Sequence, residues 1–294
     1  MPLITVKEIE EVAPIFRGKV GNSVCSWLLK VFNFNKLSDG NDSISQFRGA
    51  EFARAVQDVL AKIKVTVNGK SREDAVEELK RTLPEGPYIT ISNHLMGMVD
   101  GTILIDLFGH VRDDFKCMVN EVLTRFESLC PSLIAVNPNG DTIKTPSPQS
   151  ILGIKQAMEH LRSGKTLGIF PAGAVSDLHP FKKRTEGTYN GIHYKEPRIH
   201  DREWQVSAIK LIRWAKVPVV PVRLIDGNSR FYYNLGLLSW KLRLLRLPSE
   251  LFNKEGRTFR VSVGPVISPD TIKSCSSLDE LGALLRASVY SLGE

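Results

Sequence analysis

The feature that most constrains the fold is the alternation of short apolar runs with helix-like segments after residue 70. The apolar runs have the length of strands and lie at 88–91, 115–119, 133–136, 166–170, 217–224 and 259–263. The segments between them predict helices near 100–109, 121–129, 149–163 and 203–215. Strands that alternate with helices indicate an α/β fold with a largely parallel sheet flanked by helices. In such sheets, functional residues gather at the carboxyl ends of the strands.

The first 66 residues follow a different pattern, which predicts an N-terminal helical segment. Ser23 can cap a helix on which apolar residues recur at helical spacing. The residues of this stripe are Val24, Trp27, Leu28, Val31 and Phe32. Two interpretations stay open, a helix that faces the core and a helix that lies on a membrane surface. Residues 37–46 are polar and predict a hinge, and we divide the chain into a helical, membrane-associated segment at 1–66 and an α/β domain at 67–294.

Composition excludes several classes of protein. Hydrophobic residues make up 42% of the 294 and charged residues 24%, which is typical of a globular chain with a substantial core. The four cysteines show no C-x-x-C spacing, which disfavours a zinc or redox site. No apolar stretch reaches the ~18 residues that a spanning helix needs, and the N-terminus lacks the basic and apolar regions of a signal peptide. We therefore expect a cytoplasmic compartment.

The net charge is +7, from 39 Lys and Arg residues against 32 Asp and Glu residues. This balance suits an anionic partner, which can be a nucleic acid, a membrane surface or an acidic ligand. The sequence has no zinc ligands, RNA-binding aromatic signature or helix-turn-helix pattern. Nucleic acid is therefore the partner that we expect least.

A histidine and an aspartate follow the strand predicted at 88–91. Asp100 comes six positions after His94, at the start of a predicted helix. If the turn folds back, the carboxylate accepts a hydrogen bond from one imidazole nitrogen and leaves the other free to take a proton. Gly97 gives this turn the backbone freedom that it needs. The pair is typical of a general base whose nucleophile is a hydroxyl of the substrate; alternatively, Asp100 only caps a helix.

A second loop follows the strand predicted at 166–170 and contains the turn Pro171-Ala172-Gly173. A turn of this kind can direct backbone N–H groups into a cleft, where they can hold an oxyanion or a phosphate. The alternative is a simple tight turn with no ligand.

The two loops and the strand VPVVPV at 217–222 resemble, in this order, the glycerolipid acyltransferase family, whose best-known members acylate lysophosphatidic acid. The marks of that family are an N-H-x(4)-D loop, an F-P-E-G-T-x-S loop and a V-P-[VI]-x-P strand. The stretch from Asp201 to Trp204 and the stretch at 247–267 look like a bacterial branch of the family. That branch includes hemolysin-like acyltransferases and the O-acyltransferases that complete ornithine- and glycine-type lipids. The resemblance implies a glycerol-3-phosphate acyltransferase-like fold.

The sequence departs from the family pattern at three places. Five residues separate His94 from Asp100, one more than usual, and the bacterial branch has a similar longer loop. Ala172 and Ala174 stand where the family or the branch carries glutamates. The stretch 134–138 lacks the arginine that the family usually offers to an acceptor phosphate. The missing arginine favours a lysolipid with an amino-acid or other head group over one with a phosphate.

The resemblance implies an O-acyl transfer from an acyl thioester, carried by acyl carrier protein or coenzyme A, to the hydroxyl of a lysolipid. His94 and Asp100 are then the catalytic pair. The residues expected to bind substrate are Asn93, Gly97, Phe170, Pro171, Gly173 and Ser176. No metal or redox cofactor is implied.

Both substrates have long chains, so we expect a peripheral enzyme at the cytoplasmic face of a membrane, bound to an anionic surface. The segment 232–247 is apolar with interleaved Lys241, Arg243 and Arg246, which suits a headgroup layer. The alternative is a buried helix with charges at its rim. Two other functions stay open, synthesis of phosphatidic acid from 1-acylglycerol-3-phosphate and a catalytically inactive lipid-binding module.

Overall fold

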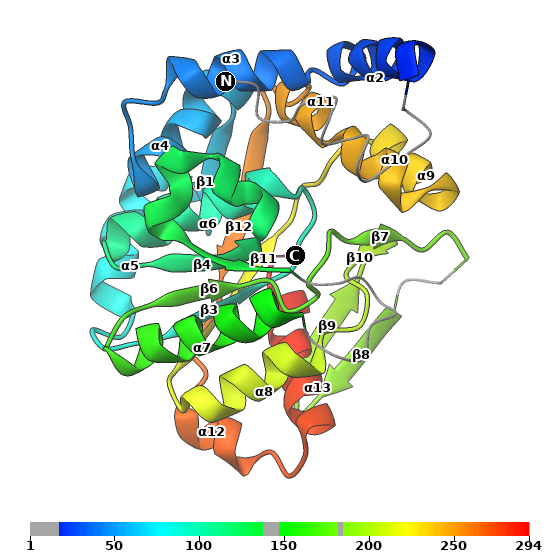
Figure 1. The fold of residues 1–294 in the computed structure, drawn as a ribbon. Helices are drawn as coiled ribbons and strands as arrows, with labels where there is room; N and C mark the ends of the chain where they lie inside the picture. The colour runs from blue at the N-terminus through cyan, green and yellow to red at the C-terminus, as the bar shows by residue number, and fades with distance from the viewer. Residues whose placement is uncertain (1–17, 138–146, 182–184, 294) are drawn as a thin grey trace.

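The protein is described by a computed structural model over residues 18–137, 147–181 and 185–293. A central sheet of eight strands has the order β2-β1-β12-β11-β3-β6-β4-β5 (Figure 1). The strand bounds are β1 Lys64–Val67, β2 Lys70–Ser71, β3 Ile89–Ser92, β4 Lys116–Asn120, β5 Leu133–Val136, β6 Leu167–Ile169, β11 Val219–Leu224 and β12 Thr258–Val263. Each of the six strands expected from the sequence is present.

Five neighbouring strands, β11, β3, β6, β4 and β5, run parallel to one another. Beyond them, β12 is antiparallel to β11 and parallel to β1, and β2 closes the edge as an antiparallel strand. Every residue of β3 and β11 is buried, as expected for strands covered on both faces. The predicted α/β fold with a largely parallel sheet is confirmed.

Helices cover both faces of the sheet (Figure 1). One layer contains α4 (Gly49–Ala55), α5 (Arg72–Thr82) and α6 (Met98–Val111). The other contains α7 (Pro148–Arg162), α8 (Val206–Ala215), α12 (Pro269–Ser274) and α13 (Leu278–Tyr290). A buried hydrophobic cluster packs each helix layer against one face of the sheet. Phe52 and Ile103 belong to the first cluster, and Ile212 and Leu285 belong to the second.

Two local predictions are wrong. Residues 37–46 are mostly helical, because α3 (Phe34–Ser43) buries Phe34 and Leu37 and leaves its charged residues exposed. The helix expected at 121–129 is instead two 3-10 helices, Glu121–Arg125 and Glu127–Ser132. Pro131 lies in the second one, and a proline disfavours the α conformation of the residue before it.

Three of the five residues in the apolar stripe predicted for α2 (Gly18–Val31) do not face the core. Val24, Trp27 and Val31 are 44%, 60% and 45% exposed, whereas Cys25 and Leu29 are buried. The interpretation as a core-facing helix is therefore wrong for these three residues.

The division of the chain at residues 66 and 67 stays a prediction. This boundary falls inside β1, which pairs with β12. Phe52 and Ala53 of α4 also belong to the core of the α/β layers.

The segment 170–205 connects β6 to α8 and carries strands that do not belong to the central sheet. It contains a pair of two-residue strands, β7 (Asp177–Leu178) with β10 (Ile199–His200), and the hairpin of β8 (Thr185–Tyr189) and β9 (Ile192–Glu196).

Three helices connect β11 to β12, namely α9 (Arg230–Leu238), α10 (Trp240–Leu245) and α11 (Leu247–Phe252). They lie at the same end of the molecule as α2 and α3 (Figure 1). No helix among the described residues has the length and apolar character needed to cross a bilayer.

The segment 232–247 is buried in part, and its contact with a headgroup layer stays a prediction. Tyr232, Tyr233 and Arg243 are buried, so the expectation that Arg243 faces lipid headgroups is wrong. Its exposed apolar residues are Leu237, Leu238, Trp240 and Leu244.

A buried carboxylate holds the first helix layer together. Asp106 of α6 has no exposed side-chain surface and accepts hydrogen bonds from Arg54 Nε at 2.9 Å and Arg72 Nη1 at 3.2 Å. Its Oδ1 also lies 3.0 Å from His110 Nδ1. A buried charge is tolerated when it is paired in this way. The contacts therefore tie α4 and α5 to α6, the helix that begins at the site described below.

We expect His110 to make the stability of the protein pH-dependent. The hydrogen bond to Asp106 is the largest influence on the pKa of His110 and raises it to about 9, from the usual value of about 6.5 for a histidine. The protonated ring therefore stabilises the fold fully below about pH 6.5, and this contribution is lost as the pH rises through about 9. After allowance for the partial exposure of the ring, the free energy of unfolding should fall by about 1–2 kcal/mol over this range. Urea unfolding measures this change, and the variant His110→Gln should lack it; equal pH dependence in both proteins would contradict the assignment.

Candidate active site

The site begins where β3 ends and α6 starts. The chain turns back between Ser92 and Met98, and Gly97 at the helix N-cap has a φ of 77°, a conformation that favours glycine. A Cβ atom at Gly97 would also lie 3.0 Å from a methyl carbon of Leu247. The turn places Asp100, in the first turn of α6, beside His94.

One oxygen of Asp100 closes this turn. Its Oδ2 lies 2.8 Å from His94 Nδ1 and accepts the backbone N–H groups of Met96 at 2.6 Å and Gly97 at 3.2 Å. Because an oxygen in this position acts as an acceptor, we assign the imidazole proton to Nδ1. Nε2 has no hydrogen-bond partner among the described residues and is the basic nitrogen.

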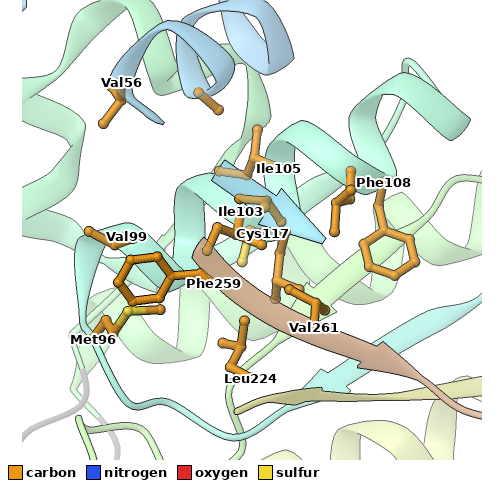
Figure 2. Packing of buried hydrophobic residues seen from close by; sticks show 14 of the residues in the cluster. Val56, Met96, Val99, Ile103, Ile105, Phe108, Cys117, Leu224, Phe259 and Val261 are labelled. Atoms are coloured by element: carbon orange, nitrogen blue, oxygen red, sulfur yellow. The ribbon is translucent and has the colours of Figure 1, made fainter. Parts of the chain in front are cut away.

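The imidazole is held on its face as well as at its edge. The ring of Phe170 stacks on that of His94 with centroids 4.2 Å apart and an interplanar angle of 26°. The His94 side chain keeps 17% of its surface exposed, so a substrate can approach it. The neighbours of His94 anchor the turn in the core, and Figure 2 shows Met96 and Val99 next to the ring of Phe259.

The second predicted loop follows β6 and has a tight turn at Gly173. The φ of Gly173 is 64°, and its N–H closes the turn on the carbonyl of Phe170 at 3.0 Å. A Cβ atom at Gly173 would lie 2.1 Å from the Nε2 atom of Gln205. The backbone N–H of Gln205 donates to the carbonyl of Pro171 at 2.8 Å. The left-handed conformation favours glycine here, and a larger residue would also have to displace the side-chain amide of Gln205.

Ser176 and Asp201 join the two loops. The N–H of Ser176 donates to the carbonyl of His94 at 2.6 Å, and its hydroxyl donates to Asp201 Oδ1 at 2.5 Å. The same Asp201 oxygen accepts the backbone N–H of His94 at 3.1 Å. Asp201 is fully buried, and this burial raises the pKa of its carboxyl. Asp201 therefore holds the backbone of His94 and the side chain of Ser176 together from the buried side of the site.

Sequence reasoning did not assign this role to Asp201. Its signal in the sequence was the likeness of the stretch from Asp201 to Trp204 to a bacterial branch. The bracing contacts span 107 positions to His94 and 25 to Ser176.

The geometry provides a base without a side-chain nucleophile. The hydroxyl of Ser176 is engaged by Asp201, and no hydroxyl or thiol among the described residues hydrogen-bonds to His94 Nε2. An acceptor hydroxyl brought by a substrate fits this arrangement.

The structure brings all eight predicted site residues together: Asp100 lies in the first turn of α6, and the other seven lie in the two connected loops. Asn93 is buried, and its side-chain amide donates to the carbonyl of Leu224 at 2.9 Å and accepts the N–H of Leu224 at 2.8 Å. It therefore joins the end of β3 to β11. Substrate contact stays a prediction for each of the six residues expected to make it: Asn93, Gly97, Phe170, Pro171, Gly173 and Ser176.

Among the described residues, no group of three His, Cys, Asp or Glu side chains is arranged to hold a metal ion.

Comparison with known proteins identifies the family. The family model described as "Acyltransferase" matches residues 62–294. The lyso-glycine lipid O-acyltransferase of Bacteroides thetaiotaomicron is 27% identical over 276 residues, which cover 92% of this chain and 89% of that protein. The protein of the same name from Phocaeicola vulgatus is 26% identical over 229 residues and 74% of each chain.

Among solved structures, the chain is similar to the 1-acyl-sn-glycerophosphate (LPA) acyltransferase PlsC of Thermotoga maritima, with 14% identity and a TM-score of 0.45. That similarity covers 98% of this chain and 93% of the other. Since the family model spans most of the chain, including both loops of the site, this protein belongs to the acyltransferase family.

Proposed function

We propose that the protein is an O-acyltransferase that moves a fatty acyl group from an acyl thioester to the hydroxyl of a lysolipid. The observation that carries this proposal is the contact of 2.8 Å between His94 Nδ1 and Asp100 Oδ2, which leaves His94 Nε2 as a base with no side-chain nucleophile. The names of the two relatives support a lysolipid as the acceptor.

In the proposed reaction, His94 Nε2 takes the proton of the acceptor hydroxyl as its oxygen attacks the thioester carbonyl. Asp100 stabilises the positive imidazole, and the thiol carrier leaves as a thiolate when the ester forms. No strong acid is required, because a thiolate is a good leaving group. The donor is an acyl group on acyl carrier protein or coenzyme A.

The backbone of the second loop supplies the donors for the tetrahedral oxyanion. The N–H groups of Gly173 and Ser176 are already bonded to the carbonyls of Phe170 and His94. Those of Ala172, Ala174 and Val175 have no partner among the described residues. We assign the oxyanion donors to this second set, where each donor is worth about 3–4 kcal/mol of transition-state stabilisation.

We infer an amino-acid-type head group for the acceptor. The stretch that follows β5 offers Asn137 instead of an arginine, and its side-chain amide is bound to Glu121 Oε1 at 2.7 Å. A neutral, engaged amide is a poor partner for a phosphate dianion. The names of the relatives agree with a glycine-type lipid. Phosphatidic acid synthesis is the second candidate.

We also propose that the protein works as a peripheral enzyme on the cytoplasmic face of an anionic membrane. Exposed apolar residues of α2, α9 and α10 support a surface that lies on lipid at one end of the molecule (Figure 1). They are Val24, Trp27, Val31, Phe231, Leu237, Leu238, Trp240 and Leu244. The net charge of +7 favours an anionic surface.

Removal of the base should abolish acyl transfer. We expect His94→Ala to lower kcat by about 10²–10⁴-fold, since that is the usual contribution of a general base. Asp100→Asn should lower kcat by a similar factor, because the amide no longer selects the tautomer with a basic Nε2. Steady-state release of the thiol carrier measures both effects.

His110→Gln is the control for these variants, because it replaces a histidine of α6 outside the site. It should keep the wild-type kcat, and thermal unfolding should show that each variant is folded. Full activity of a folded His94→Ala protein would overturn the assignment of the base.

A panel of lysolipids should identify the acceptor. We expect mass spectrometry to show acylation of a lyso-glycine lipid with a kcat/KM at least about tenfold above that for lysophosphatidic acid, a difference of about 1.4 kcal/mol. Phosphatidic acid as the main product would favour the second candidate. No consumption of either acyl-coenzyme A or acyl carrier protein thioester would favour an inactive lipid-binding module.

Two tryptophans with the same exposure test the lipid surface. Trp240 on α10 and Trp214 on α8 are both 59% exposed. Loss of one buried aromatic ring costs about 1.5–3 kcal/mol, so Trp240→Ala should bind anionic vesicles at least about tenfold more weakly in a sedimentation assay. Binding by the wild-type protein should fall as salt rises. Equal losses for Trp240→Ala and Trp214→Ala would contradict this surface.

A further inference from the structure

Arg243 of α10 is a buried cation that contacts the second loop of the site. Its side chain is 4% exposed. Nη1 donates to the carbonyl of Ser176 at 3.1 Å and to Asp177 Oδ1 at 2.6 Å, and Nη2 donates to the carbonyl of Val175 at 3.2 Å. One guanidinium therefore holds three successive residues of this loop.

The surroundings of Arg243 are shaped around its side chain. A Cβ atom at Gly236 of α9 would lie 2.8 Å from Arg243 Cδ, so glycine makes room for the arginine stem. The guanidinium carbon lies 5.5 Å from the centre of the Tyr232 ring. Asp177 also pairs with Arg202 at 2.8 Å and so keeps a cationic partner if Arg243 is replaced.

The contacts need the fork of an arginine. Two carbonyls and one carboxylate receive donors from two nitrogens in one plane, whereas a lysine offers a single point charge on a flexible stem. A lysine at this position can pair with Asp177 but cannot hold both carbonyls in the same way.

The loop held by Arg243 is connected directly to the base. Ser176, whose carbonyl accepts from Arg243, donates its N–H to the carbonyl of His94 at 2.6 Å. The first loop is held from the same helices, because the hydroxyl of Tyr233 on α9 donates to the carbonyl of Leu95 at 2.7 Å. The pair α9–α10 therefore contacts both loops of the site.

We propose that Arg243 is a positioning residue that fixes the loop from Val175 to Asp177 against His94. The effect on the reaction rests on the proposed function, in which Val175 and the neighbouring Ala174 are among the oxyanion donors. Arg243 contacts no reacting atom; it acts through the carbonyls that it holds.

Hydrogen exchange tests the hold of Arg243 on the loop without any need for activity. In the full-length protein, we expect the backbone amides of Ser176 and Asp177 to exchange at least tenfold faster in Arg243→Met than in the wild type, because Ser176 donates to His94 and Asp177 pairs with His200. Arg54→Met is the matched control, because it also removes a guanidinium from a carboxylate but in a different part of the fold, at Asp106. It should leave exchange in the loop unchanged. Equal exchange in the wild type and Arg243→Met would overturn the proposal.

Kinetics test the consequence for the reaction. We expect Arg243→Met to lower kcat at least tenfold with little change in the KM of the lysolipid, and Arg243→Lys to fall between it and the wild type. Arg54→Met should keep the wild-type kcat even if it lowers the unfolding temperature. Faster loop exchange with an unchanged kcat would overturn a role in catalysis. If the wild-type protein transfers no acyl group, the proposed function fails, and the exchange measurement still decides whether Arg243 holds the loop.

Discussion

The site depends on one carboxylate oxygen that accepts three hydrogen bonds. Asp100 Oδ2 receives the imidazole of His94 and two backbone N–H groups of the same turn. The two backbone bonds fold the turn, and the imidazole bond orients the ring, so one buried charge serves both structure and chemistry. The start of α6 adds to this arrangement, because a helix N-terminus favours a negative charge in its first turn. The base therefore has its tautomer assigned before any substrate arrives.

The parallel sheet explains why two distant loops meet. β3 and β6 are neighbours that run in the same direction, so the loops that follow them leave the sheet at the same edge. Strand order brings the two loops to the same edge of the sheet but does not fix the distance between their side chains. The final alignment comes from buried polar contacts, in which Asp201 holds His94 to Ser176 from behind. Such contacts are strong where water is absent, and they cost stability when a partner is missing.

Much of the architecture and the reacting pair could be predicted from the sequence, because these features are local. Apolar runs identify strands, and the spacing between His94 and Asp100 is spanned by one turn. The role of Asp201 and the burial of Arg243 could not be predicted, since both depend on partners far away in the chain. Arg243 was misassigned for a physical reason. A cation between exposed apolar residues can extend to lipid headgroups or turn inward to pair with a carboxylate, and the sequence pattern is the same in both cases. The 3-10 helices likewise share their apolar spacing with an α-helix.

Asn93 gives the site a tolerance that follows from its chemistry. Its amide bonds to both backbone groups of Leu224, so it mimics one more rung of the sheet between β3 and β11. These two hydrogen bonds involve only the backbone atoms of Leu224, so they do not depend on the side chain at that position. Substitutions along β11 that preserve its volume can therefore accumulate during evolution without displacing the neighbouring histidine. Sequence change in β11 is therefore separated from the alignment of the His94 imidazole.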